Sequence, residues 1–160
     1  YDYLLFTLDD VLFEKLDIFQ MTNILKNNNL KFLSPVIKNA TWKCMDKLLN
    51  SNNVLAYTNI FEIFTLFMKA EDFKLFLSLN DINNKWIWGV DYMFDFLNIK
   101  TAVTYSNICL HKYKSKNESN LFNLRVKDMN NYFKKNNKSL KIIKKKFKNN
   151  ILIKEFKFLK

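Results

Sequence analysis

The stretch LLFTLDDVLF, residues 4–13, places two adjacent carboxylates directly after one apolar run and before another. The first run predicts a buried strand that ends at Asp9 and Asp10. Neighbouring negative charges repel each other, and removing them from water is costly unless a positive charge compensates. Two interpretations follow: the pair lies in a solvated turn, or it binds a divalent cation.

The rest of residues 1–113 alternates between strand-like and helix-like patterns. Strands are expected in LKFLSPVI (30–37, closed by the proline), NVLAY (53–57), FEIFTLFMK (61–69) and IKTAVTYSNICLH (99–111). Helices are expected in KLDIFQMTNILKNNN (15–29), AEDFKLFLSL (70–79) and WGVDYMFDFL (88–97). This alternation predicts an α/β fold with a mixed, mainly parallel sheet flanked by helices. In such sheets ligands bind beyond the carboxyl ends of strands, where Asp9 and Asp10 fall.

The positive charge of the chain is concentrated in its last third. Residues 114–160 hold 15 of the 26 Lys and Arg but only 3 of the 15 Asp and Glu. This shift predicts a near-neutral body, residues 1–113, followed by a Lys-rich tail, residues 114–160, that is partly helical or disordered. The tail is interpreted as an amphipathic segment on an anionic membrane surface, as a contact for nucleic-acid phosphates, or as a solvated helical extension. Since unpaired lysines resist burial, we expect it to pack loosely or not at all.

Composition excludes several classes of protein. With 49% hydrophobic and 16% aromatic residues, the chain is typical of a globular domain. No apolar run reaches the roughly 18–20 residues that a membrane-spanning helix needs. Cys44 and Cys109 have no spacing typical of a metal or redox site, and two cysteines form no disulfide framework. These features leave the cellular compartment open.

Two further groups of residues are candidates for a functional role. The only glycine of the chain, Gly89, follows Trp86 and Trp88 and precedes Asp91. Glycine permits positive φ or close approach of a ligand, and an acid in the first turn of a helix is either a favourable charge or a functional group. The tryptophans are expected either to stack on a sugar ring or to pack in the core. The only histidine, His111, is either structural or a metal ligand beside Asp10.

Taken in order, the motifs resemble a known superfamily. They are YDYLLFTLDDV, FLSPVI, FEIFTLFMKAEDFKLFL, WIWGVDYMF and ICLHKY. This order resembles the type A, nucleotide-diphospho-sugar glycosyltransferases, nearest to little-characterised families with a DxD-type motif, an F-x-E strand, a GWG-x-D helix start and a C-terminal V-x-H. The resemblance covers residues 1–113 and implies a metal-dependent transfer of sugar from a nucleoside-diphosphate donor to an acceptor hydroxyl.

The resemblance assigns roles to individual residues. Asp10 and Asp9 match the last and middle positions of the DxD-type motif, which binds the Mn²⁺ or Mg²⁺ that bridges the diphosphate of the donor. His111 matches the histidine that joins the metal, and Asp91 matches the catalytic base of inverting members. Glu62 matches the acid of the F-x-E strand, in the acceptor region.

Leu8 departs from the pattern, since it stands where these families usually have the first acid of the motif. The units that hold the nucleoside precede the DxD strand in the superfamily, so we expect the native protein to be longer and this chain to be the second half of such a domain. The alternatives are a catalytically inactive binding or scaffold protein with the same fold, and a nucleic-acid or membrane-surface protein acting through the tail. Donor, acceptor and stereochemical outcome stay open.

Overall fold

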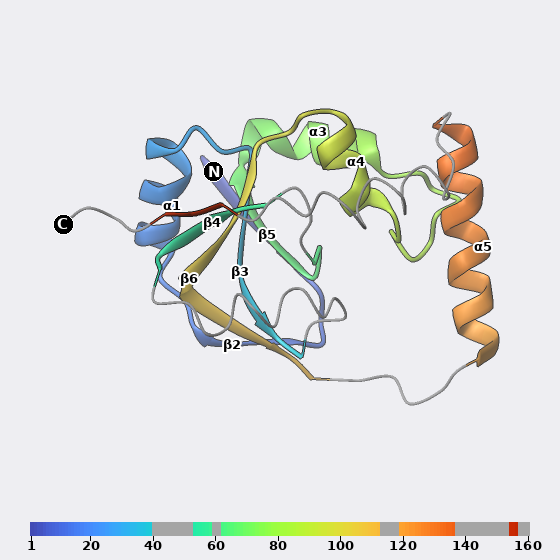
Figure 1. The fold of residues 1–160 in the computed structure, drawn as a ribbon, viewed down its shortest axis with the longest axis horizontal. Coiled ribbons are helices and arrows are strands. Elements are labelled where there is room, and N and C mark those ends of the chain that lie inside the picture. Colours follow the sequence, from blue (N-terminus) through green and yellow to red (C-terminus); the bar gives the residue numbers. More distant parts are fainter. Residues whose placement is uncertain (40–52, 59–61, 113–118, 137–153, 157–160) are drawn as a thin grey trace.

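The computed structural model describes residues 1–39, 53–58, 62–112, 119–136 and 154–156, which form one curled sheet with helices on both faces (Figure 1). The described strands are β1 Tyr3–Thr7, β2 Val11–Lys15, β3 Phe32–Lys38, β4 Leu55–Tyr57, β5 Thr65–Lys69, β6 Thr101–His111 and β7 Lys154–Phe156. The described helices are α1 Ile18–Asn27, α3 Phe73–Leu79, α4 Val90–Phe96 and α5 Ser119–Lys135, and a short 3₁₀ turn, η2 Ala70–Asp72, precedes α3. The predicted mixed α/β class is confirmed.

The sheet has the order β1-β5-β3-β6-β4-β7, and β2 pairs with β6 outside this path. Among the described strands, only β3 and β6 run parallel, whereas the five other pairings are antiparallel. The expectation of a mainly parallel sheet is therefore not confirmed. The reason is that an apolar pattern identifies a strand but carries no information on its direction, and neighbours such as β1 and β5 lie far apart in the chain.

Helix α1 covers one face of the sheet. The side chain of Asp17 caps its first turn by accepting a hydrogen bond from the Gln20 backbone N–H at 2.9 Å. Met21, Ile24 and Leu25, spaced at helical intervals, are buried against the strands. The asparagine cluster after Lys26 ends the helix as predicted from the sequence.

Helices α3, α4 and α5 lie on the opposite side of the sheet from α1 (Figure 1). Their buried side chains join those of β3, β4, β5 and β6 in the larger hydrophobic core. Aromatic rings dominate this core: Phe32 contacts Phe94 with ring centroids 5.0 Å apart, and Phe6 contacts Phe76 at 5.2 Å. Such pairs add to the free energy gained from burial.

The described part of the tail is the largest difference from expectation. Residues 119–135 are helical, as predicted, but α5 does not pack loosely, because Tyr132 and Phe133 are 3% and 1% exposed in the larger core. The lysines of the helix stay outside, since Lys134 and Lys135 are exposed. The last turn of α5 thus buries two rings while its lysines stay in water. The net charge of the tail gave no indication of this arrangement.

Strand β6 contains an irregularity that affects the placement of its second half. Its first part, up to Thr104, pairs with β3 up to Pro35, and the pairing resumes at Ile108 with Val36. Three residues of β6, numbers 105–107, are therefore unmatched by β3. Pro35 does not close β3, contrary to expectation, because the strand continues through this bulge.

No helix within the described residues is both long and apolar enough to cross a membrane.

Candidate functional site

Asp9 and Asp10 form the turn between β1 and β2, at the end of β1 where the sequence places them. The turn is fixed on both sides: the Leu8 N–H donates to the Phe64 carbonyl at 2.9 Å, and the Lys112 N–H donates to the Asp10 carbonyl at 2.9 Å. These bonds tie the turn to the start of β5 and to the end of β6. Asp9 is exposed, whereas Asp10 is partly buried.

The same pairing brings His111 to Asp10. Strand β2 runs antiparallel to β6 with Val11 opposite His111, so the last residue of β6 lies beside the turn. His111 Nε2 and Asp10 Oδ2 are 2.9 Å apart, although the residues are 101 positions apart in the chain. The proximity that the sequence predicts is confirmed.

An aromatic ring shields this pair. The ring of Phe64 stacks on the imidazole of His111 with centroids 4.3 Å apart and planes inclined by 24°. The side chains of His111 and Asp10 are only 14% and 27% exposed. A partly dry environment strengthens the attraction between a carboxylate and any cation beside it.

The geometry allows a test of the expected metal. Asp10 Oδ1 is buried and accepts no hydrogen bond, so one carboxylate oxygen is available to a ligand. Mg²⁺ and Mn²⁺ accept carboxylate oxygen, and Mg²⁺ is held by one or two carboxylates together with waters and substrate phosphates. Within the described residues no group of three His, Cys, Asp or Glu gathers closely enough to hold an ion alone. Asp10 and His111 therefore fit an ion that shares its coordination with a phosphate ligand.

Leu8, at the position where the resemblance predicts an acid, has a structural role. Its side chain packs on a small apolar cluster that contains Val11, Ile37 and Cys109. A carboxylate at this position would lie against apolar side chains, which disfavours its charged form. The apolar surroundings of this position thus suit a leucine better than an acid.

Asp91 and Glu62 form a second acidic group. Both residues are buried, each 6% exposed, and Asp91 lies in the first turn of α4. Burial raises the pKa of the Asp91 carboxyl to about 7, and the negative charge of Glu62 adds to the rise. Backbone N–H groups of Gly89, Asp91 and Tyr92 oppose the rise by donating to the carboxylate. A buried acid with a pKa near neutrality is a candidate proton acceptor.

Phe64 touches the first site and is close in the chain to the second acidic group. It stacks on His111 and lies two positions after Glu62, which limits the distance between the Cα atoms of Glu62 and Phe64 to about 7 Å. Glu62 in turn acts on Asp91 electrostatically, by adding to the rise in the pKa of its carboxyl. That Asp91 lines one cleft with Asp10 stays a prediction.

Gly89 is required by geometry. Its φ is +92°, and a Cβ added there would lie 2.7 Å from Cζ of Phe133. The expectation that the backbone needs this glycine is confirmed by its positive φ. The group that approaches is a ring of α5 rather than a ligand.

Trp86 and Trp88 are engaged by α5. The Arg125 guanidinium lies over both indoles, with Cζ 4.6 Å and 5.7 Å from the ring centroids of Trp86 and Trp88. The edge of Phe122 also meets Trp88 at 5.9 Å between centroids. These contacts support the packing interpretation of the tryptophans over the sugar-stacking one.

Sequence reasoning missed Phe64 and Arg125. Phe64 stands among other phenylalanines, and its position over His111 follows from the bond between Leu8 and Phe64, which no sequence pattern encodes. Arg125 is hidden in the lysine-rich tail, but it is the only arginine of the chain, and this could have been a signal.

Comparison with known proteins adds no assignment. No protein family matches the chain, and neither the curated proteins nor the solved structures give a match.

Proposed function

We propose that the chain is a type A glycosyltransferase-like protein and that it transfers a sugar from a nucleoside-diphosphate donor to an acceptor hydroxyl. The observation that carries the proposal is the pair of Asp10 and His111 at the end of β1, with Asp10 Oδ1 buried and unpartnered. The mixed sheet and the motif order support it.

In this proposal Asp10 and His111 hold Mg²⁺ or Mn²⁺, which would neutralise the charge that develops on the leaving diphosphate. Asp91 accepts the proton of the acceptor hydroxyl, and a carboxylate whose pKa is raised to about 7 is well matched to this task near neutral pH. The acceptor oxygen bonds to the anomeric carbon while the bond from that carbon to the diphosphate breaks. The electron pair of the broken bond leaves with the nucleoside diphosphate.

A second candidate, a binding protein of the same fold without catalysis, is favoured by one observation. Leu8 replaces the first acid of the motif and packs on apolar side chains. Such a protein would bind the nucleotide without transferring the sugar.

The test measures Mn²⁺-dependent binding of UDP and GDP to the chain by calorimetry. We expect Asp10→Ala and His111→Ala to weaken this binding at least tenfold, because the phosphates lose their bridge. Asp2→Ala, which removes an exposed carboxylate near the same strand, is the matched control and should bind like the parent chain. Equal binding by Asp10→Ala and the control would remove the proposed site.

Transfer separates the two candidates. Asp91→Asn should bind the nucleotide normally and lose transfer to water or to an added acceptor. A chain that binds the nucleotide but transfers nothing, both in its parent form and with Tyr132→Ala/Phe133→Ala in α5, would support the binding protein.

A further inference from the structure

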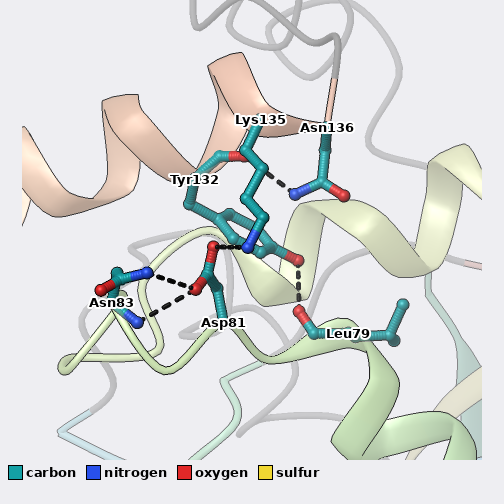
Figure 2. Close-up of polar contacts among 6 residues, drawn as sticks. All are labelled: Leu79, Asp81, Asn83, Tyr132, Lys135 and Asn136. Atoms are coloured by element: carbon teal, nitrogen blue, oxygen red, sulfur yellow. Dashed lines mark hydrogen bonds and ion pairs between the residues drawn. The ribbon is translucent and has the colours of Figure 1, made fainter.

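Helix α5 is attached to the body through its last turn. The Tyr132 hydroxyl donates to the Leu79 carbonyl at 2.6 Å, and Lys135 Nζ lies 2.7 Å from Asp81 Oδ2 (Figure 2). Asp81 is itself held by Asn83, whose backbone N–H donates to it at 3.0 Å. Both partners belong to the segment that follows or ends α3, so one site on the body receives the end of the helix.

The first half of α5 is held differently. Phe122 and Leu124 are 55% and 50% exposed, and the Nε of Arg125 is buried without a hydrogen-bond partner. Apart from the stacking of Arg125 and Phe122 on the tryptophans, the helix meets the larger core through the buried rings of Tyr132 and Phe133, with Met129 packed beside them. Two adjacent rings therefore act as the anchor of α5.

This anchor lies over the start of α4, where Asp91 stands. The ring of Phe133 fits against Gly89, two residues before Asp91, and meets Tyr92, the residue after it, edge-on at 5.9 Å between centroids. Tyr132 is close enough for the charge of Asp91 to add to the rise in the pKa of its hydroxyl that burial causes. The anchor thus contacts residues on both sides of the acid in the chain, Gly89 before it and Tyr92 after it.

We propose that α5 is a cover in cis over Asp91, which shuts this carboxylate away from solvent and from an acceptor until the anchor of Tyr132 and Phe133 is withdrawn. The proposal rests on the proposed function in taking Asp91 as the group that must meet the acceptor. It adds that the described chain represents the closed state. In that state Asp91 is present as the proton acceptor, but the hydroxyl of the sugar acceptor cannot reach it.

The test measures the accessibility of Asp91 in the full chain, by its rate of modification with a water-soluble carbodiimide and an amine, read by mass spectrometry. The variant Tyr132→Ala/Phe133→Ala removes the anchor. The matched control, Leu124→Ala/Lys127→Ala, removes two exposed side chains of the same helix. We expect modification of Asp91 to be at least tenfold faster in the anchor variant and within twofold of the parent chain in the control.

A second measurement separates opening from unfolding. Cys109 is fully buried in the small cluster beneath β2, where α5 makes no contribution, and should resist alkylation in a folded body. Fast modification of Asp91 with a protected Cys109 supports the cover. Unchanged modification of Asp91, an equal rise in the control, or a rise accompanied by alkylation of Cys109 overturns it, the last because α5 would then be an inseparable part of the body.

The modification needs neither nucleotide nor metal. Failure of the cover is therefore distinct from failure of the proposed function, which the binding of UDP and GDP by Asp10→Ala tests.

Discussion

Replacing Asp91 by asparagine should remove a pH dependence from the stability of the fold. Asp91 holds its proton to about pH 7 in the folded chain, whereas its ordinary pKa is 3.8. Between these values Asp91 makes the folded state bind more protons than the unfolded state, so its contribution to the free energy of unfolding falls as pH rises through this window and is level on either side. A difference of about 3 pKa units at 1.36 kcal/mol per unit corresponds to about 4 kcal/mol.

Asparagine has nearly the shape of the protonated acid and does not ionise. The Asp91→Asn variant should therefore match the parent chain near pH 4 and exceed its stability by up to about 4 kcal/mol at pH 8. Urea unfolding at a series of pH values measures the difference between the two. Asp2→Asn, which changes an exposed carboxylate, should leave the slope of the parent chain intact. A constant difference between Asp91→Asn and the parent chain across this range would refute the reasoning.

Two further substitutions test how α5 and α4 meet. Gly89→Ala should destabilise the fold by about 2–5 kcal/mol in urea, because it combines an unfavourable φ with overpacking against the buried ring of Phe133; an unchanged midpoint would contradict the close approach. Tyr132→Phe should cost about 1 kcal/mol by leaving the Leu79 carbonyl without its donor. Tyr1→Phe, at a fully exposed position, is its control, and equal stability of the two variants would speak against this bond.

The proximity of Asp10 and His111 was within reach of the sequence. The acidic pair follows a strand pattern and the histidine ends another, so their meeting requires only that these two ends share an edge of the sheet. That they do so through β2 could not be predicted, because the short pattern VLFEK is as compatible with a loop as with a strand. The sequence therefore predicts that the two side chains meet, but not that strand β2 brings them together.

Strand direction and the docking of α5 were beyond the sequence. Direction depends on which strands pair across long separations, and apolar periodicity is the same for both directions. For α5, the sequence predicts a partly helical tail, but its many lysines argued for loose packing. Two buried rings outweigh exposed charges that never leave water, and this balance is visible only once the receiving surface, with Gly89 at its centre, is known.

In the bulge of β6, the number of residues in the segment 105–107 matters for the placement of His111. Numbers 105–107 are unmatched by β3, yet they set how far the strand has advanced when it reaches β2 and delivers His111 opposite Val11. Because side chains alternate between the faces of a strand, losing one of these residues would turn the imidazole to the wrong face, whereas exchanging one for another would not. In the descent of such a chain, single insertions and deletions here are changes that selection must remove.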